Sequence, residues 1–430
     1  VYLRLSDPDA QDNYEIFDTV RVASREDTAK NHRIIIEKEK ETKTDNKLLL
    51  RQLLFKPGTR YDQELYQRTI NEFQNLQMMT VRRFGLSEQG GMPDYSQSDL
   101  PIIFELQTLP RHRINYELFG MRRYGYGAGA GITYTNNNLR RGAEVLQLSV
   151  DGSFEYSSPD ISDNVDDRIL RSFNTQLNYT LPRLTWPVAT LDQRLFFSNA
   201  QTTYSISYAR ANQLNFDINA DVRFNMQYQV RHTNTRSSFL DLFELDWLDT
   251  TPTDRFEEIL DQQFPDSLSL DRKRIEEDFK PQFSSTIRYT YRNTNTNIIK
   301  RDYGHYMEAT FSFGGNVPYL LDRFLVTPDT LETRLPSLFD LSGNSLTYSQ
   351  YVKLSFDYRN YNSISDKTTW AYRFLAGFAH PIGKNDVIPL NRRFFAGGSN
   401  DIRGYAPFSL GPGDIPLDQV TVNGGEIKLA

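Results

Sequence analysis

Polar and apolar side chains alternate without interruption from Asn215 to Val230. Every second residue in this stretch is apolar, and the residues between them are amides, aspartates or arginine. Because successive side chains of a β-strand point to opposite faces, the pattern predicts one strand with a polar face and an apolar face. The predicted strand is longer than the ~5–6 residues typical of strands in globular proteins.

The same alternation recurs along most of the chain after Arg113, where helical periodicity almost disappears. The further predicted strands are Arg113–Leu118, Leu146–Tyr156, Phe173–Leu181, Thr203–Tyr208, Ser285–Arg292, Met307–Phe313, Val352–Tyr358 and Trp370–Phe378. A soluble β-sandwich also alternates in this way, but these strands are long and numerous, and their polar face carries amides and charges at nearly every step. This favours a transmembrane β-barrel, whose apolar face meets lipid while its polar face lines a wet lumen. No apolar run approaches the ~18 residues of a membrane-spanning helix.

Two further features of the strand region leave alternatives open. Glycine occupies every second position from Gly125 to Gly131, which places the glycines on one side of a strand and argues against a dinucleotide-binding loop. They mark either close packing at a bend or a deliberately pliable wall. Two inserts, Ser237–Pro281 and Val317–Ser349, interrupt the strands. The first is acidic, and we interpret its cluster as a solvated helix face rather than a cation site; the cluster comprises Asp241, Glu244, Asp246 and Asp249.

Residues 13–110 show a mixed pattern that predicts a small α+β module. A helix begins after Asp62, a residue type that caps helix N-termini, and its apolar residues recur at helical spacing up to Leu76. In chain order the predicted elements are a strand at Tyr14–Val22, helices at Asn46–Phe55 and Asp62–Leu76, and strands at Met79–Leu86 and Leu100–Leu109. Residues 1–12, with a strand at Val1–Leu5, are expected to end a preceding module of the same kind.

The net charge, the lack of cysteine and the scattered histidines exclude several classes of function. The chain has 55 acidic and 49 basic residues and a net charge of −6, which gives no reason to expect a nucleic-acid partner. Cysteine is absent, which excludes disulfides and thiol chemistry. The histidines are dispersed, and neither a phosphate-binding loop nor a nucleophile elbow occurs. We therefore predict no metal, no cofactor and no catalytic residue.

One motif stands out near the end of the chain. Between Arg393 and Gly413 (RFFAGGSNDIRGYAPFSLGPG), a Gly-Gly turn, an Arg-Gly-aromatic core and a Gly-Pro pair follow one another. After so many strands, this order resembles the sixth-loop signature of the BamA/TamA superfamily of outer-membrane assembly proteins. The family often has Phe where this chain has Tyr405. The motif residues are Gly397, Gly398, Ile402, Arg403, Gly404, Tyr405, Gly411 and Pro412.

The rest of the chain agrees with the resemblance. Residues 13–110 look like the last POTRA domain of such proteins, and Asn136–Gly142 (NNNLRRG) resembles their first periplasmic turn. The resemblance implies a membrane β-barrel of about sixteen antiparallel strands when intact. Residues 111–430 would supply the first eleven strands and, at Gly424–Ala430, the start of the twelfth. The chain begins without a signal-peptide pattern and ends inside this strand, so we expect a piece of a longer protein.

The resemblance implies a factor that inserts or translocates unfolded outer-membrane or secreted proteins, with no covalent chemistry. Its barrel would lie in the lipid bilayer of a Gram-negative outer membrane and its POTRA domain in the periplasm, with periplasmic or lipoprotein accessory subunits. The Gly-Pro ending of the motif and the long inserts favour the TamA-like branch over BamA. A two-partner-type secretion translocator of the same superfamily and a passive porin are the alternatives, and a POTRA-like module argues against the porin.

The resemblance also indicates which residues are functional. The first barrel strand should form a lateral gate that seals weakly against the last strand, and its residues include Arg113, Asn115, Glu117 and Gly120. Arg403 should lie in a partly buried polar site inside the barrel, where a planar guanidinium suits carboxylate partners.

The α+β module should bind clients by adding a strand to an exposed sheet edge. Pro110 ends the candidate strand Leu100–Leu109, so Met79–Leu86 is the favoured docking strand, with Arg82 and Phe84 as the docking residues.

Overall fold

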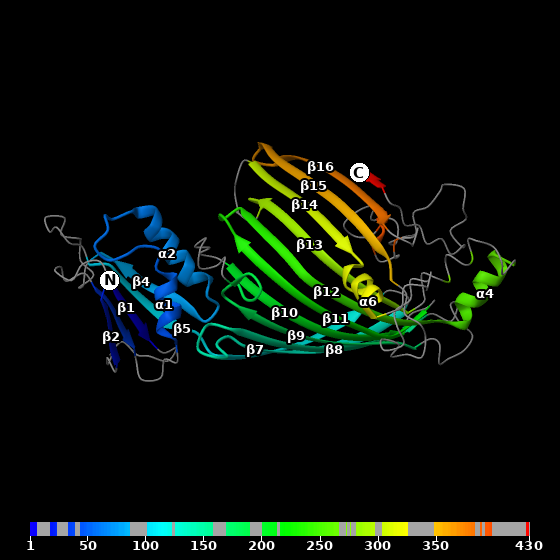
Figure 1. Ribbon diagram of the computed structural model, residues 1–430, viewed down its shortest axis with the longest axis horizontal. Coiled ribbons are helices and arrows are strands. Elements are labelled where there is room, and N and C mark those ends of the chain that lie inside the picture. The colour runs from blue at the N-terminus through cyan, green and yellow to red at the C-terminus, as the bar shows by residue number, and fades with distance from the viewer. Residues whose placement is uncertain are drawn as a thin grey trace. The chain divides into compact units, whose positions relative to one another are not determined.

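The computed structural model describes residues 1–6, 18–23, 33–38, 44–86, 101–122, 125–157, 169–189, 200–212, 216–265, 272, 276, 281–296, 303–325, 348–382, 388, 392–397 and 427–429. These residues contain a five-stranded sheet and a twelve-stranded sheet (Figure 1). Backbone contacts divide the chain into two compact units. The first unit combines residues 1–115 with 133–148 and 178–202, and the second contains the rest. None of the helices in the described ranges is long and apolar enough to cross a membrane.

The first unit holds the five-stranded mixed sheet, in the order β2-β3-β1-β5-β4. Strand β1 lies in the middle and is parallel to both β3 and β5, whereas β2 and β4 pair antiparallel at the two edges. The elements are β1 (Tyr2–Ser6), β2 (Asp18–Ala23), β3 (Arg33–Lys38), α1 (Asn46–Gln52), α2 (Gln63–Asn75), β4 (Met79–Gly85) and β5 (Ile103–Thr108).

This sheet differs from the prediction in how its N-terminal strands are used. The segment Val1–Leu5 was expected to end a preceding module, but β1 is the central strand of this same sheet. Strand β3 was not predicted. The strand predicted at Tyr14–Val22 is described from Asp18 onward, as β2. The N-cap of α2 is confirmed: Asp62 Oδ1 accepts hydrogen bonds from the amides of Glu64 (2.8 Å) and Leu65 (3.2 Å).

The core of the first unit lies between the helices and one face of the sheet. Leu3 of β1, Leu49 of α1, Phe73 of α2 and Phe104 of β5 are fully buried in one cluster. Ala143, from the turn after the first hairpin of the larger sheet, is buried in the same cluster. This turn therefore packs as part of the α+β core.

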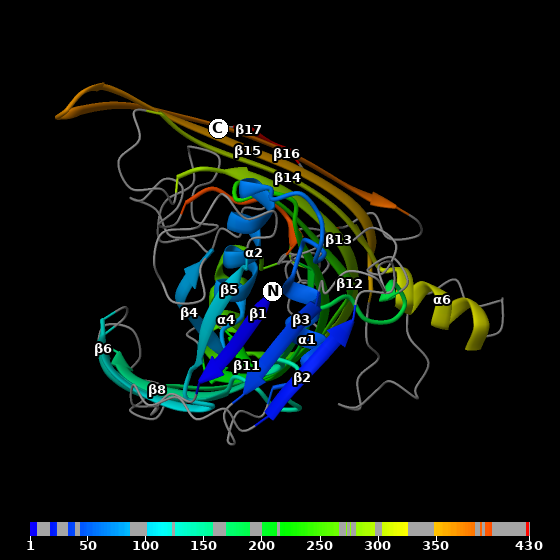
Figure 2. The same ribbon diagram turned by 90° about the vertical axis from the view of Figure 1, so that its left-hand side faces the viewer.

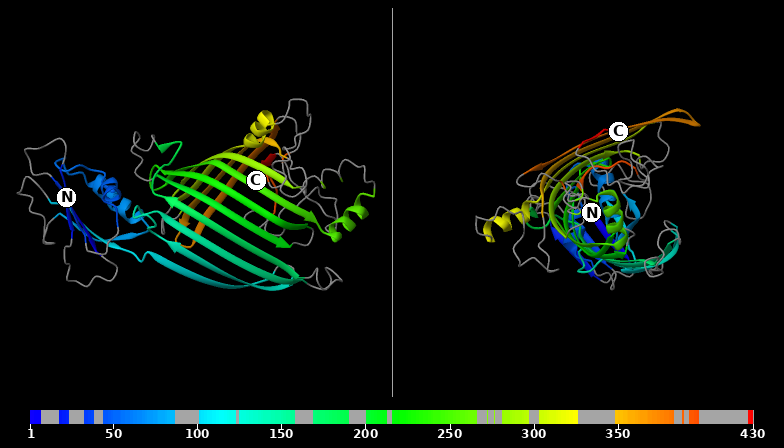
Figure 3. Two further views of the ribbon diagram at one scale, coloured as in Figure 1. Left: turned by 60° about the horizontal axis from the view of Figure 1, so that its bottom comes forward. Right: turned by 90° about the vertical axis from the view of Figure 1, so that its right-hand side faces the viewer.

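The twelve-stranded sheet is antiparallel and follows the chain order from β6 at one edge to β17 at the other. Figures 2 and 3 show its strands curving into a wall. The strands are β6 (His112–Met121), β7 (Gly125–Asn136), β8 (Val145–Ser157), β9 (Ile169–Leu181), β10 (Ala200–Asn212), β11 (Phe216–Arg231), β12 (Arg236–Pro252), β13 (Gln282–Thr294), β14 (Tyr303–Gly314), β15 (Gln350–Ser365), β16 (Thr368–Ile382) and β17 (Ile427–Leu429). The predicted eleven strands and the start of a twelfth are confirmed.

The two faces of the sheet differ as the alternation predicts. Large apolar side chains are exposed on one face, including Leu118 of β6 (86%), Phe154 of β8 and Phe374 of β16. Charged and amide side chains on the other face pair with one another across strands. A sheet that exposes aromatic residues on one face needs an apolar environment on that face.

Strand β12 corrects the interpretation of the acidic insert. Residues 237–252 belong to this strand, and the helix α4 (Asp254–Gln263) begins only after it. In the pairing with β11, Met226 is opposite Phe243 and Gln227 is opposite Asp241, so Leu242 is an extra residue in a β-bulge. A bulge shifts the side-chain pattern by one residue. Strict alternation is therefore broken inside this strand and did not predict it. The predicted solvated helix face was wrong.

Candidate functional site

Charged side chains on the polar face of β12–β14 pair across neighbouring strands. Arg288 of β13 contacts Glu244 of β12, with 2.5 Å between Nη2 and Oε2. Arg292 of β13 contacts Glu308, directly opposite on β14, with 2.8 Å between Nη2 and Oε2. The β12 bulge makes this arrangement possible, because it turns Asp241 and Glu244 to the same face although they are three residues apart.

Arg392 connects the chain between β16 and β17 to this charged face. Its Nη1 lies 2.8 Å from Glu244 Oε1, and its Nη2 lies 3.6 Å from Asp246 Oδ2. The side chain of Arg392 is 13% exposed and that of Asp246 is 7% exposed. Arg223 of β11 approaches the other oxygen of Asp246 at 3.5 Å. Buried charges are tolerated when they are paired. The carboxylates of Glu244 and Asp246 therefore hold Arg392 against the polar face of the sheet.

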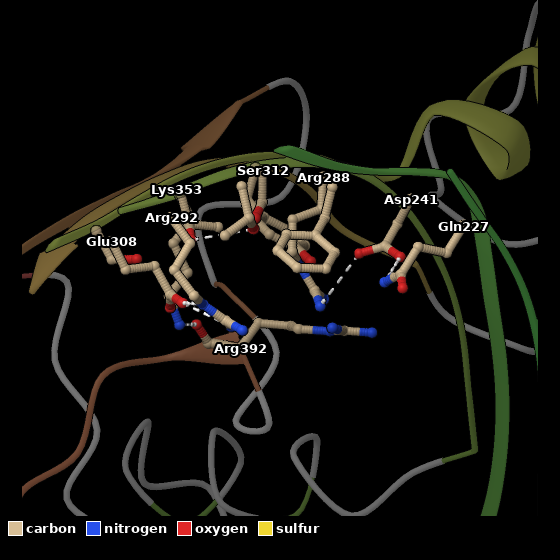
Figure 4. A pocket seen from close by; sticks show the side chains of 13 residues that line it. Gln227, Asp241, Arg288, Arg292, Glu308, Ser312, Lys353 and Arg392 are labelled. Atoms are coloured by element: carbon tan, nitrogen blue, oxygen red, sulfur yellow. Dashed lines mark hydrogen bonds and ion pairs between the residues drawn. The ribbon is translucent and has the colours of Figure 1, made fainter. Parts of the chain in front are cut away.

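A cavity of about 590 Å³ adjoins this cluster. Figure 4 shows side chains that line it, among them Arg288 and Arg392. Its charged lining contains more basic side chains than acidic ones. The lining residues are Gln227, Phe239, Asp241, Arg288, Thr290, Arg292, Glu308, Thr310, Ser312, Tyr351, Lys353, Ser355 and Arg392. The polar face therefore borders a wet space rather than a packed core.

The segment 392–397, here called the loop root, is held by further contacts with the wall. Lys353 Nζ of β15 donates a hydrogen bond to the carbonyl of Arg392 (2.8 Å) and lies 4.1 Å from the ring centroid of Phe394. The Phe394 ring packs directly on Gly377 of β16, where a Cβ atom would overlap it. The loop root is therefore fixed by an ion pair, a hydrogen bond and a close ring contact.

One residue of the predicted sixth-loop motif lies in the loop root. Gly397 is buried and has a φ of 95°, a backbone conformation that favours glycine. The other seven motif residues lie outside the described residues: Gly398, Ile402, Arg403, Gly404, Tyr405, Gly411 and Pro412. The polar site expected for Arg403 remains a prediction.

The residues that anchor the loop root were not predicted from the sequence. Arg392 directly precedes the recognised motif, and Glu244 was assigned to a helix. Interpreting Arg236–Pro252 as a bulged strand would have placed Glu244 and Asp246 on the polar face. Their partner could not have been named, because Arg392 is 148 residues away from Glu244 in the sequence.

The predicted gate strand corresponds to β6, at one edge of the twelve-stranded sheet. Its strand neighbour in the described part of the chain is β7. The gate residues Arg113, Asn115, Glu117 and Gly120 are all exposed on this strand.

The glycines of β7 allow close approach. The ring of Phe119 occupies the space where Gly129 would carry a Cβ atom, and the Phe154 backbone does the same at Gly127. The amide of Gly125 also donates to Glu155 Oε1 (2.9 Å). Of the two interpretations left open, these contacts support close packing.

The predicted docking strand corresponds to β4, an edge of the five-stranded sheet, whereas the rejected candidate, β5, lies between β1 and β4. Phe84 is 49% exposed, and its ring contacts Tyr66 of α2 edge-on at 6.0 Å between centroids. The register shifts between Val81 and Arg83, so Arg82 forms a bulge. Bulges and charges on an edge hinder strand addition, so Phe84 is the better docking position of the two.

No group of three or more His, Asp or Glu side chains that could hold a metal ion occurs among the residues for which the structure gives positions.

Comparison with known proteins places this architecture in a family. A model of the Omp85 superfamily domain matches residues 135–430. BamA from Haemophilus ducreyi lacking POTRA domains 1–3 is 15% identical, with 92% of this chain and 66% of that chain covered and a TM-score of 0.48. CdiB from Acinetobacter baumannii (10% identity, 86% and 58% covered, TM-score 0.45) and CdiB from Escherichia coli (12%, 86% and 60%, 0.42) are also similar.

The chain thus spans 58–66% of the length of these structures. Because the family model covers more than half of the chain, the protein belongs to the Omp85 superfamily, and its twelve-stranded sheet is part of an outer-membrane β-barrel.

Proposed function

We propose that this protein is an assembly factor that receives unfolded outer-membrane or secreted proteins and inserts or translocates them at a barrel seam formed by β6. The α+β unit is the POTRA domain, lies in the periplasm and binds the clients. Periplasmic or lipoprotein subunits are expected partners. No reaction is catalysed in this scheme, because strand pairing and the membrane environment supply the driving force.

The direct link between the two sheets carries the proposal. Strand β5 of the α+β sheet ends at Thr108, and β6 begins at His112, so only residues 109–111 separate them. The turn after β7 holds this link. The Asn137 amide donates to the Arg111 carbonyl (2.9 Å), and Arg111 Nη2 donates to the Leu139 carbonyl (2.9 Å). Only three residues of chain therefore separate the sheet proposed to bind clients from the strand proposed as the seam.

In the proposed scheme β6, the first barrel strand, is the strand that opens at the seam. An edge strand offers a row of backbone donors and acceptors that can pair with another strand. Inside a bilayer water cannot satisfy these groups, so pairing with a client strand is strongly favoured there. A client strand that pairs with β6 would be folded and inserted in one step.

The element order of the α+β unit supports the POTRA assignment. A strand, two helices and two strands follow one another as β3, α1, α2, β4 and β5, and the last two form a hairpin with β4 outermost. Main-chain pairing along such an edge is tolerant of sequence, which suits a receptor for many different clients.

The test introduces a single cysteine into this chain, which has none of its own. Asn115→Cys on β6 is expected to form disulfides with cysteines in a stalled client strand. Ser207→Cys is the matched control, because it lies on β10, which has β9 and β11 on either side. Crosslinking that is equal at the two positions would contradict a seam at β6 and favour transport through the lumen.

A second experiment separates the branches of the superfamily. Depletion of the protein, followed by analysis of the outer-membrane proteome, should reduce many barrels for a BamA-like role. Selective loss would indicate a TamA-like factor or a dedicated secretion translocator. An unchanged proteome together with lost solute permeability would support the passive porin.

A further inference from the structure

We propose that the helix α6 (Asn316–Leu325) is a membrane-interface anchor. Its exposed apolar side chains Tyr319, Leu320 and Phe324 insert among lipid acyl chains at the rim where β14 ends. Nothing in the assembly role requires such a helix. The proposal depends on the barrel being in a membrane, and it is independent of what the barrel transports.

The first observation is that α6 packs on the outer wall of the barrel. Leu321 of α6 packs with Trp247 of β12, Phe283 of β13 and the buried Tyr348. Trp247 and Phe283 are directly opposite each other in the strand register. Asp246 joins the charged cluster on the polar face, so its neighbour Trp247 points to the opposite face, which meets lipid. Figure 2 shows α6 outside the curved wall, in agreement with these contacts.

The second observation is that the start of α6 is fastened to the wall. The amide of Gly315 donates to the Ser285 carbonyl (2.7 Å), and the amide of Val317 donates to Ser285 Oγ (3.0 Å). Asn316 Nδ2 donates to the Phe313 carbonyl (3.2 Å). Gly315 has a φ of 80°, and a Cβ there would overlap the Ser349 carbonyl, so the turn that directs α6 along the wall requires glycine.

The third observation is an exposed apolar stripe on α6. Leu320 is 49% exposed and Phe324 is 79% exposed, and a spacing of four residues places them on one side of the helix. Tyr319 beside them is 38% exposed. Leu321 is the residue of α6 that packs against the barrel wall. The stripe at Leu320 and Phe324 therefore faces away from the protein core. In water this stripe would be unfavourable.

The stripe is continuous with the lipid-facing surface. Two and four residues beyond Ser285 on β13, Ile287 and Tyr289 are 36% and 45% exposed, and Phe311, opposite Tyr289 on β14, is 45% exposed. Aromatic residues gather at the interfaces of membrane barrels, and amphipathic helices bury their apolar side at the headgroup boundary. The occupant that fits both surfaces at once is the lipid itself.

The test measures the depth of α6 in the bilayer. Phe324→Cys is labelled with an environment-sensitive fluorophore, and the full-length protein is reconstituted into dioleoyl phosphatidylcholine vesicles that contain acyl-brominated lipid. Leu320→Cys is a second labelled variant that keeps Phe324. Glu258→Cys, on the exposed surface of α4, is the matched control. The label on α6 should show blue-shifted emission, quenching by brominated acyl chains and protection from aqueous iodide, whereas the label on α4 should show the reverse.

Two results would overturn the proposal. Equal quenching by iodide at α6 and α4 would place α6 in water. Protection of α6 from both quenchers would show that protein covers it, such as a second copy of this chain. No client is present in the vesicles, so either result would leave the proposed assembly function standing.

Discussion

Arg392 Nη1 lies 2.8 Å from Glu244 Oε1, and this ion pair joins the root of the sixth loop to the bulged strand β12. The side chains are 13% and 17% exposed, so both charges have lost most of their water. Arg288 contacts the other oxygen of Glu244, and Glu244 therefore bridges two arginines. The loop root is held in the barrel by charges that would be costly to separate.

Removing the Arg392 guanidinium should lower the stability of the barrel. Arg392→Ala leaves Glu244 with Arg288 alone and Asp246 with the more exposed Arg223 alone, so the loss should lie below the about 3–5 kcal/mol of a buried charge left fully unpaired. Arg392→Lys should recover only part of the lost stability, because one ammonium group cannot pair with two carboxylates as a guanidinium does. Samples are heated to a series of temperatures and then run on a cold gel. The measurement is the temperature at which the band of the folded barrel disappears. Arg373→Ala is the control, since the Arg373 side chain is 34% exposed and its ion pair with Asp357 is therefore better hydrated. Equal midpoints for Arg392→Ala and the wild type would contradict the anchor.

Adding one methyl group at Gly377 should loosen the loop root. A Cβ at this position overlaps the Phe394 ring, so Gly377→Ala must displace the ring. We expect faster cleavage of the sixth loop by added protease on intact cells. The double variant Gly377→Ala/Phe394→Leu should restore protection in part, because the smaller side chain makes room. Gly152→Ala is the control, since its nearest neighbour would be 3.5 Å away, an ordinary contact. Unchanged cleavage of Gly377→Ala would show that this packing does not hold the loop.

Glu144 should be required for the turn that grips the link to β6. Its Oε2 accepts hydrogen bonds from the amides of Arg140 (3.1 Å) and Gly142 (3.0 Å), and the residue is buried. Glu144→Ala leaves these two part-buried donors without their acceptor, at no more than about 1–3 kcal/mol for each. Hydrogen exchange of the turn amides should accelerate in Glu144→Ala and change little in Glu144→Gln, which keeps an acceptor. Equal acceleration in both variants would show that the negative charge matters rather than the acceptor.

A proline on β4 should reduce client binding by the α+β unit. Phe84→Pro removes a backbone donor from the edge strand, whereas Phe84→Ala removes only the ring that contacts Tyr66. Crosslinking of an unfolded client to this unit should therefore fall in the proline variant and persist in the alanine variant. The melting temperature of each variant checks that the unit remains folded. Equal loss of crosslinking in the two variants would assign client binding to the Phe84 ring. No loss in either variant would indicate that clients bind at the other edge, β2.

The sequence by itself determined the local elements whose pattern is uninterrupted. The alternation at Asn215–Val230 predicted β11, and the N-cap at Asp62 predicted the start of α2, because side-chain direction and helix capping depend on residues close in the chain. The alternation marked most of the barrel strands, whereas the expected eleven strands and the start of a twelfth followed from the resemblance to the family. The motif at Arg403 indicated the family, and the family match over residues 135–430 confirmed it.

Tertiary structure alone decided the pairing between distant segments. Strand β1 lies between β3 and β5, and Leu3 is opposite Phe104, a register that no local pattern records. The bulge at Leu242 hid β12, and with it the strand that carries Glu244. Whether a carboxylate faces water or a buried arginine depends on which distant segment packs next to it. That is set by the folding of the whole sheet and of the segment after β16, which brought Arg392 to Glu244 across 148 residues of chain.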